Sequence, residues 1–296
     1  MYRVRKQLGC SDMLQQTCKG SPVTVAVLDT GIYPHPDFMG RIVAFQDFVN
    51  QKSMIYDDSG HGTHVAGCIG GSGLSSGGKY RGIAPQSLLC VGKVLDREGD
   101  GSIENMYHGL LWIMQNRLKY RIRVLNISVG IGQNGEQKKL EEVAGLLEAV
   151  WDAGIVVVCA AGNAGPSNGT ISPLGKSRKV ITVGCHEGGY FGKRNDLCEN
   201  YSGRGDVDEP IRKPDIVAPG TDIMSCSNKG NSYVKKSGTS MATPIVSGAV
   251  ALLLQKYPYL NNEQVKRKMV YSAKDLGDVW NKQGWGMLDI EKLLEY

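Results

Sequence analysis

The chain has 296 residues, a net charge of +5, 41% hydrophobic residues and 21% charged residues. At this length about three quarters of the unfolded surface can be buried, so a large core needs neither disulfides nor metal ions. The basic residues are scattered and no aromatic residues alternate with them, which argues against nucleic acid as a partner. The sequence also lacks the run of about 18 apolar residues that a membrane-spanning helix requires, so no membrane insertion is expected.

The eight cysteines include no C-x-x-C pair, so the spacing typical of zinc ligands is absent. Cys90, Cys159 and Cys185 fall in apolar runs, where a free cysteine behaves as a small buried hydrophobe. We therefore expect reduced thiols, with a Cys10–Cys18 pair left open for an exported protein. The first residues lack the apolar segment of a signal peptide. This predicts a cytoplasmic protein, or a secreted one if the sequence is a mature fragment.

Strand-like apolar runs alternate with amphipathic segments along the chain. The runs are residues 23–28, 87–94, 124–128, 155–160 and 180–184. Between and after them, apolar spacing predicts helices over residues 103–114, with Ser102 as N-cap, over 140–151 and over 240–257. The last helix is apolar nearly all round and should be buried. This alternation predicts an α/β protein of three layers, with a mostly parallel central sheet and helices on both faces.

No repeat or linker divides the chain, so we expect one domain over residues 22–296, preceded by an N-terminal arm over residues 1–21. Three polar residues lie where the predicted strands end or helices begin. Asp29 follows the first strand, His61 stands between two glycines at a helix start, and Ser240 opens the buried helix. Each has an ordinary explanation by itself, because Asp often forms Asx-turns and Ser often caps helices. His64 raises the possibility of a metal site, but the H-E-x-x-H pattern is absent.

The order Asp29, His61, Ser240 is the order found in subtilisin. The segments DTGI, HGTHVAG and GTSMATP resemble the signatures of the subtilase family. The segments VLNISVG, AAGNAG, RKPDIVAPG and WGMLDIEKLL are similar to further family segments, so the resemblance spans residues 22–290. The chain therefore resembles a subtilisin-like serine protease of peptidase family S8, closest in character to the intracellular bacterial subtilisins.

This resemblance implies a serine endopeptidase with Asp29, His61 and Ser240 as its catalytic triad and Asn163 as an oxyanion donor. Protein or peptide substrates are the implied partners. The implied substrate-binding residues form two walls and the primary pocket: Gly101, Ser102, Ile103, Ser128, Val129, Gly130, Ala160, Ala161 and Gly162. No charge lies in these stretches, which predicts broad specificity with an apolar or aromatic residue at P1, the substrate residue before the cleaved bond.

The chemistry implied by the resemblance requires no cofactor. Structural calcium is a separate question, because Asp37 matches a carboxylate that contributes to a calcium site in many subtilases. The loop that should complete this site, residues 70–85, contains neither Asp nor Asn. Calcium favours sites that include carboxylates, so the loop argues against a tight site and leaves a weak one open. Asp57, Asp58 and the acidic residues at 96–100 are alternative ligands. The oligomeric state is not determined by the sequence.

Two other functions compete with a protease. A subtilase fold could serve only for binding, but such a scaffold has no physical need for Asp29, His61, Ser240 and Asn163 together. A nucleotide-binding Rossmann protein has a similar architecture. Its first strand is followed by G-x-G-x-x-G, whereas here the first strand is followed by DTGI.

Overall fold

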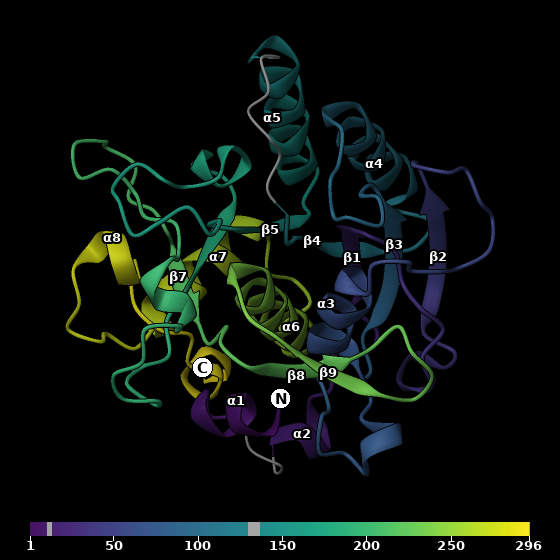
Figure 1. The fold of residues 1–296 in the computed structure, drawn as a ribbon, viewed down its shortest axis with the longest axis horizontal. Coiled ribbons are helices and arrows are strands. Elements are labelled where there is room, and N and C mark those ends of the chain that lie inside the picture. Colours follow the sequence, from purple (N-terminus) through teal and green to yellow (C-terminus); the bar gives the residue numbers. More distant parts are fainter. Residues whose placement is uncertain (11–13, 130–136, 296) are drawn as a thin grey trace.

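The computed structural model describes residues 1–10, 14–129 and 137–295. Its centre is a seven-stranded sheet with the order β2-β3-β1-β4-β5-β6-β7, in which every pair of neighbours is parallel (Figure 1). The predicted α/β fold with a parallel central sheet is confirmed. The strands are β1 (Thr24–Asp29), β2 (Ile42–Asp47), β3 (Leu88–Lys93), β4 (Ile122–Ile127), β5 (Val156–Ala160), β6 (Ile181–Cys185) and β7 (Ile216–Ala218).

The central strands are buried along their whole length. Every residue of β1 is buried, and the strand pairs with β3 on one side and β4 on the other. A strand covered on both faces has no solvent side, so its sequence is apolar throughout and does not alternate. The five predicted strands are found with their ends displaced by one or two residues. Strands β2 and β7 were not predicted, because β2 is a half-exposed edge strand and β7 has only three residues.

Helices cover both faces of the sheet. In Figure 1, α4 (Ile103–Asn116) and α5 (Gln137–Asp152) lie above the sheet, whereas α3 (His61–Gly70) and α6 (Thr239–Lys256) lie below it. The predicted three layers are therefore present. Ser102 caps α4 as expected, because its hydroxyl accepts a hydrogen bond from the Asn105 N–H at 3.0 Å. Nearly all of α6 is buried, and this explains why its sequence is apolar nearly all round.

Shorter elements complete the molecule. An antiparallel hairpin of β8 (Ile223–Cys226) and β9 (Tyr233–Lys236) packs below α3. At the C-terminal end of the chain come α7 (Asn262–Ser272), α8 (Trp280–Gln283) and α9 (Ile290–Leu294). At the other end, α1 (Tyr2–Gln7) and α2 (Leu14–Thr17) precede the first strand. No helix among residues 1–10, 14–129 and 137–295 is both long and apolar enough to cross a membrane.

The first helix packs into the same core as the sheet. Met1, Val4 and Leu8 are buried in it, and Arg3 forms an ion pair with buried Glu187 at 2.7 Å. The boundary at residue 21 between an arm and a domain stays a prediction. The packing of α1 nevertheless means that this segment contributes to the stability of the whole molecule.

Candidate active site

The carboxyl ends of the parallel strands bring the predicted Asp and His together. Asp29 is the last residue of β1 and is buried, whereas His61 is the first residue of α3 and its side chain is 24% exposed. The His61 Nδ1 atom lies 2.7 Å from the Asp29 Oδ1 atom. An open α/β sheet forms its sites at this edge. The imidazole therefore has a buried carboxylate on one side and borders solvent on the other.

Two opposing effects set the pKa of His61. Burial lowers it, because a charged imidazole loses hydration. The negative charge of Asp29 and its hydrogen bond stabilise the charged ring, and together they raise the pKa of His61 above its ordinary value. The Asp29 Oδ2 atom is buried without a hydrogen-bond partner in the described part of the chain. The Oδ1 atom, in contrast, contacts His61 and accepts a hydrogen bond from the Thr30 N–H at 2.8 Å.

The glycines around His61 permit a close approach of α3 to the end of β1. A Cβ atom on Gly62 would lie 2.2 Å from the Gly31 carbonyl oxygen and 3.2 Å from the Asp29 Cβ atom. No side chain fits in that space. Gly62 is therefore required for the 2.7 Å contact between His61 and Asp29.

A buried carboxylate that the sequence did not reveal holds the start of α3. Asp57 accepts hydrogen bonds from the backbone N–H groups of Ser59, Gly60 and Thr63 and from the hydroxyls of Thr30 and Thr63, at 2.6–3.1 Å. A negative charge at a helix N-terminus is also favoured by the helix dipole. Asp57 therefore ties β1 to α3 directly beside His61. The sequence places Asp57 four residues before His61. It does not show which donors the carboxylate binds, because these donors lie both before and after the histidine in the chain.

Ser240 lies in the first turn of α6, next to the side-chain amide of Asn163. The Asn163 Oδ1 atom accepts hydrogen bonds from the Thr239 N–H at 3.1 Å and from the Thr239 hydroxyl at 3.0 Å. These two bonds fix the amide oxygen, so the Nδ2 group faces the other way. That group lies 3.3 Å from the position a Cβ would take on Gly238. A side chain there would therefore crowd the amide, and Gly238 has a φ of 146°, a value that favours glycine.

The described hydrogen bonds do not include one between the Ser240 hydroxyl and the His61 ring. Such bonds are often long in enzymes without substrate and tighten in the complex. Ser240 is half-buried.

The predicted substrate-binding residues also follow the carboxyl ends of strands. Ser128 and Val129 follow β4, and Ser128 is fixed by a hydrogen bond from the Asn126 amide at 2.9 Å. Ala160 ends β5, and Ala161 and Gly162 follow it. The carbonyl groups of all three residues accept hydrogen bonds, so the backbone of this segment is held in place. The remaining three, at the start of α4, are Gly101, Ser102 and Ile103. Gly130 lies outside the described residues.

His64 is a structural residue. It is buried, and its Nε2 atom lies 2.9 Å from the Ile223 carbonyl oxygen and 3.1 Å from that of Val234. Both partners are acceptors, so Nε2 carries the proton. Burial lowers the pKa of His64 to about 3. A neutral ring joins α3 to the β8–β9 hairpin.

The residues around Asp37 do not fit a calcium ion. Its carboxylate accepts hydrogen bonds from the N–H groups of Gly73 and Ser75, the Tyr233 hydroxyl and the Cys226 thiol. A calcium ion needs oxygen ligands, whereas donors surround this carboxylate. The Asp57 carboxylate likewise accepts five hydrogen bonds from protein donors. Asp58 accepts one from the buried Lys93 ammonium at 2.8 Å.

In the described part of the chain, His35, Asp37 and Cys226 form a group of potential metal ligands. Ligand atoms of His35, Asp37 and Cys226 lie within 4.8 Å of one another and are buried. All of them already have partners, because the His35 Nδ1 atom accepts from the Asp37 N–H at 3.1 Å and the Cys226 thiol donates to Asp37. The cluster is therefore satisfied by hydrogen bonds alone.

Comparison with known proteins gives a consistent family. A sequence profile of the subtilase family, peptidase S8, matches residues 20–286. Serine protease AprX of Bacillus subtilis is 42% identical, over 90% of this chain and 64% of AprX. Subtilisin DY of Bacillus licheniformis is 34% identical, over 93% of this chain and 92% of that protein. The solved structure of sphericase superposes with a TM-score of 0.78 at 29% identity, over 91% of this chain and 89% of that one.

The chain thus spans less than two thirds of AprX but nearly the whole of subtilisin DY. The profile covers most of the chain, and the same edge of the sheet carries the Asp, His, Asn and Ser residues described above. The chain belongs to the subtilase family of serine endopeptidases.

Proposed function

We propose that this chain hydrolyses peptide bonds through an acyl-enzyme, with Ser240 as nucleophile, His61 as general base and Asp29 as the carboxylate that orients the base. The observation that carries this proposal is the 2.7 Å contact between His61 Nδ1 and buried Asp29. An imidazole with a carboxylate on Nδ1 holds its proton there, so its Nε2 lone pair is free to accept a proton. That atom is available to the Ser240 hydroxyl.

The Ser240 hydroxyl proton moves as covalent bonds form and break in the reaction. As Ser240 Oγ attacks the carbonyl carbon, its proton passes to His61 Nε2, and the imidazolium is stabilised by Asp29. His61 then gives this proton to the leaving amine as the peptide bond breaks. Water attacks the resulting ester in the same way and restores Ser240. These steps use side chains only and need no cofactor.

The developing oxyanion needs hydrogen-bond donors beside Ser240. We assign this role to the Ser240 backbone N–H, at the start of α6, and to the Asn163 Nδ2 group. Thr239 supports the assignment because it holds the amide oxygen and leaves the Nδ2 group for the substrate. The N-terminal end of α6 adds a favourable dipole. Donors fixed before the reaction stabilise the charge without reorganising.

Protein or peptide substrates should bind along the walls at residues 101–103 and 128–130 by backbone pairing. The two stretches expected to wall the primary pocket, residues 128–130 and 160–163, contain no charged residue. We therefore propose a preference for large apolar or aromatic residues at P1. Cleavage of a peptide library followed by mass spectrometry checks this, and a dominance of Lys or Arg at P1 would contradict it.

We further propose that the chain works in a reducing compartment, the cytoplasm. All eight cysteines are buried, and none of them forms a disulfide. Free thiols persist where cellular reductants are present, whereas exported proteins tend to pair them. Alkylation of the unfolded protein from fresh cell extract, without added reductant, should label all eight thiols. A pair that reacts only after reduction would argue for export.

A fluorophosphonate probe tests the proposed activity. It should label the protein on Ser240, and Ser240→Ala should abolish both labelling and peptide cleavage while the melting temperature stays unchanged. Thr243→Ser is a matched control, because Thr243 is a buried hydroxyl of the same helix that only bonds the Thr239 carbonyl. Labelling that survives in Ser240→Ala would assign the nucleophile elsewhere, and no labelling of the wild type would favour a binding scaffold.

A further inference from the structure

A cavity lies at the opposite edge of the sheet from the candidate active site. It has a volume of about 530 Å³. Its lining includes Arg178, shortly before β6 begins, and Asp215, immediately before β7 begins, together with one side of α7. Asp29, His61 and Asn163 lie where strands end. Because the strands are parallel, their starts and ends lie at opposite edges, so this cavity is separate from the catalytic edge. Its size falls within the range of small-molecule sites, about 300–1,000 Å³.

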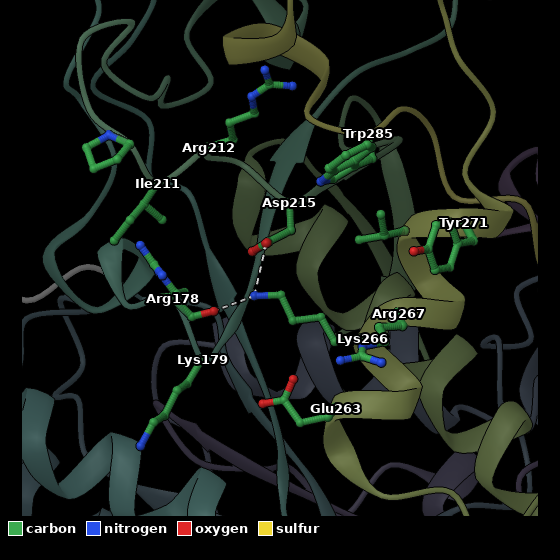
Figure 2. Close-up of a pocket in the computed structure, with 12 residues that line it drawn as sticks. Arg178, Lys179, Ile211, Arg212, Asp215, Glu263, Lys266, Arg267, Tyr271 and Trp285 are labelled. Carbon is green, nitrogen blue, oxygen red and sulfur yellow. Dashed lines mark hydrogen bonds and ion pairs between the residues drawn. The ribbon is translucent and has the colours of Figure 1, made fainter.

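The floor of the cavity carries more positive than negative charge. The buried Asp215 carboxylate pairs with the Lys266 ammonium at 3.0 Å (Figure 2). Lys213, which is buried and not part of the lining, also donates a hydrogen bond to Asp215 at 2.7 Å. Two lysines therefore share one carboxylate. Burial lowers the pKa of Lys213 to about 8, and the positive charge of Lys266 contributes to this despite Asp215. A bound anion would offset this surplus charge.

Further cations stand around the floor. Figure 2 shows Arg178 and Arg267 on opposite sides of Lys266. Neither guanidinium has an acidic partner among residues 1–10, 14–129 and 137–295. Arg178 contributes only its backbone carbonyl to the structure, as the acceptor of a 2.7 Å hydrogen bond from Lys266. The one other carboxylate in the lining, Glu263, already accepts from the Trp151 indole at 3.1 Å. Both arginine side chains are thus available to an anion.

An exposed aromatic wall adjoins these charges. The Trp285 side chain is 51% exposed and that of Tyr271 is 78% exposed, although large aromatic rings usually avoid solvent. The backbone of Trp285 lies in a tight turn. Its backbone N–H donates to the Asp215 carbonyl at 3.0 Å, and Gly284 and Gly286 on either side have positive φ. Trp285 lies beside Asp215 in the lining of the cavity (Figure 2).

We propose that this cavity binds a small aromatic anion, with its phosphate or carboxylate group bound by the Arg178 and Arg267 guanidinium groups and its planar ring against Trp285. Lys266 contributes positive charge only, because its ammonium group already donates to the Arg178 and Val180 carbonyl oxygens and pairs with Asp215. Guanidinium groups match the geometry of both oxyanions and form charge-assisted hydrogen bonds with them. The exposed indole supplies a flat surface for a ring. This site does not depend on the proposed proteolytic mechanism.

Isothermal titration calorimetry on the Ser240→Ala protein tests the proposal, because self-digestion is then removed. Phenyl phosphate has both required groups, inorganic phosphate and phenol each have one, and benzoate replaces the phosphate by a carboxylate. We expect saturable binding of phenyl phosphate, at least about tenfold tighter than that of inorganic phosphate or phenol. The relative affinity of benzoate shows which oxyanion the site prefers.

Substitutions then locate the site. Arg178→Gln with Arg267→Gln should weaken phenyl phosphate about tenfold or more, because charged hydrogen bonds are lost. Trp285→Leu should weaken phenyl phosphate but leave inorganic phosphate unchanged. Arg97→Gln, an exposed arginine elsewhere, is the matched control and should change nothing. Absence of saturable binding, or equal affinity in the double variant and the control, would overturn the proposal. All these side chains are exposed, so the variants should fold.

Discussion

Asn163 shows how one side chain can be committed to a single task by its neighbour. Thr239 donates to the amide oxygen through both its N–H and its hydroxyl, and the amide nitrogen is left on the side of Gly238. An Asn in a glycine-rich segment would otherwise be free to turn either way. The rigidity of this amide is the physical basis for assigning it to the oxyanion.

Asn163→Ala should lower kcat strongly while KM changes little, because the donor acts mainly on the transition state. Removal of the oxyanion asparagine of subtilisin costs about 10²–10³ in kcat, which sets the scale expected here. Steady-state kinetics on a chromogenic peptide, with the melting temperature as a check of folding, measure the effect. Asn168→Ala is a suitable control, since Asn168 bonds only the distant Asn281 amide. An unchanged kcat would remove Asn163 from the mechanism.

His64 should make the protein less stable in acid. The unfolded chain binds a proton at this residue below about pH 6.5, whereas the folded protein does so only near pH 3. Between these values the unfolded state holds more protons, so the free energy of unfolding falls as pH falls, by up to about 1.4 kcal/mol per pH unit from this group.

Urea unfolding of the Ser240→Ala protein between pH 7.5 and pH 4.5 measures this slope. His64→Gln should be less stable at neutral pH but have a shallower dependence on pH, because the group that titrates is gone. His108→Gln, on an exposed side chain, should keep the wild-type slope. Equal slopes in His64→Gln and His108→Gln would mean that His64 is not the source.

At the scale of elements, the position of α3 decides whether a histidine meets a carboxylate. On one side, α3 contacts β1 through Gly62, and on another side it packs against α6. Asp57 accepts a hydrogen bond from the Gly60 N–H at the start of the helix. The helix start therefore depends on a residue outside the helix. Asp57 is a positioning residue, because it reaches the imidazole only through the backbone of α3.

Asp57→Asn should reduce both stability and turnover. The amide NH₂ group would face N–H or hydroxyl groups that now donate to the carboxylate. Each buried donor left without an acceptor costs about 1–3 kcal/mol of folding stability. We expect a lower melting temperature, and a kcat for chromogenic peptide that falls more than KM changes. Asp208→Asn, in an exposed loop, is the matched control. A kcat equal to that of the control would show that Asp57 does not position His61.

At the scale of the whole molecule, the Asp37 carboxylate is the centre of a hydrogen-bond network. It joins residues 73–75 to Tyr233 of β9 and Cys226 of β8, segments far apart in the sequence. Because these donors already occupy the carboxylate, we predict little gain in stability from a cation there.

The melting temperature should be the same in EDTA and in millimolar calcium. A ligand that binds the folded state raises stability with its concentration, so a calcium site would give a higher melting temperature in calcium. Differential scanning calorimetry of the Ser240→Ala protein checks this without self-cleavage. Asp37→Asn should lower the melting temperature in both buffers. A rise of several degrees in calcium would contradict the absence of a strong site.

The sequence by itself determined the alternation of strands and helices and the order Asp29, His61, Ser240. These features depend on local apolar spacing and on short signatures, which need no knowledge of distant partners. The buried helix at 239–256 is an example, because a helix that is apolar nearly all round is stable only when it is buried.

Only the tertiary structure decided which polar groups meet. Asp57 was merely a possible calcium ligand in the sequence, and folding surrounds it with five donors. The orientation of Asn163, the filled carboxylate of Asp37 and the cationic cavity at Asp215 and Lys266 likewise depend on residues many positions apart. Hydrogen bonds and ion pairs act over a few ångströms, so their partners are fixed by packing rather than by spacing along the chain.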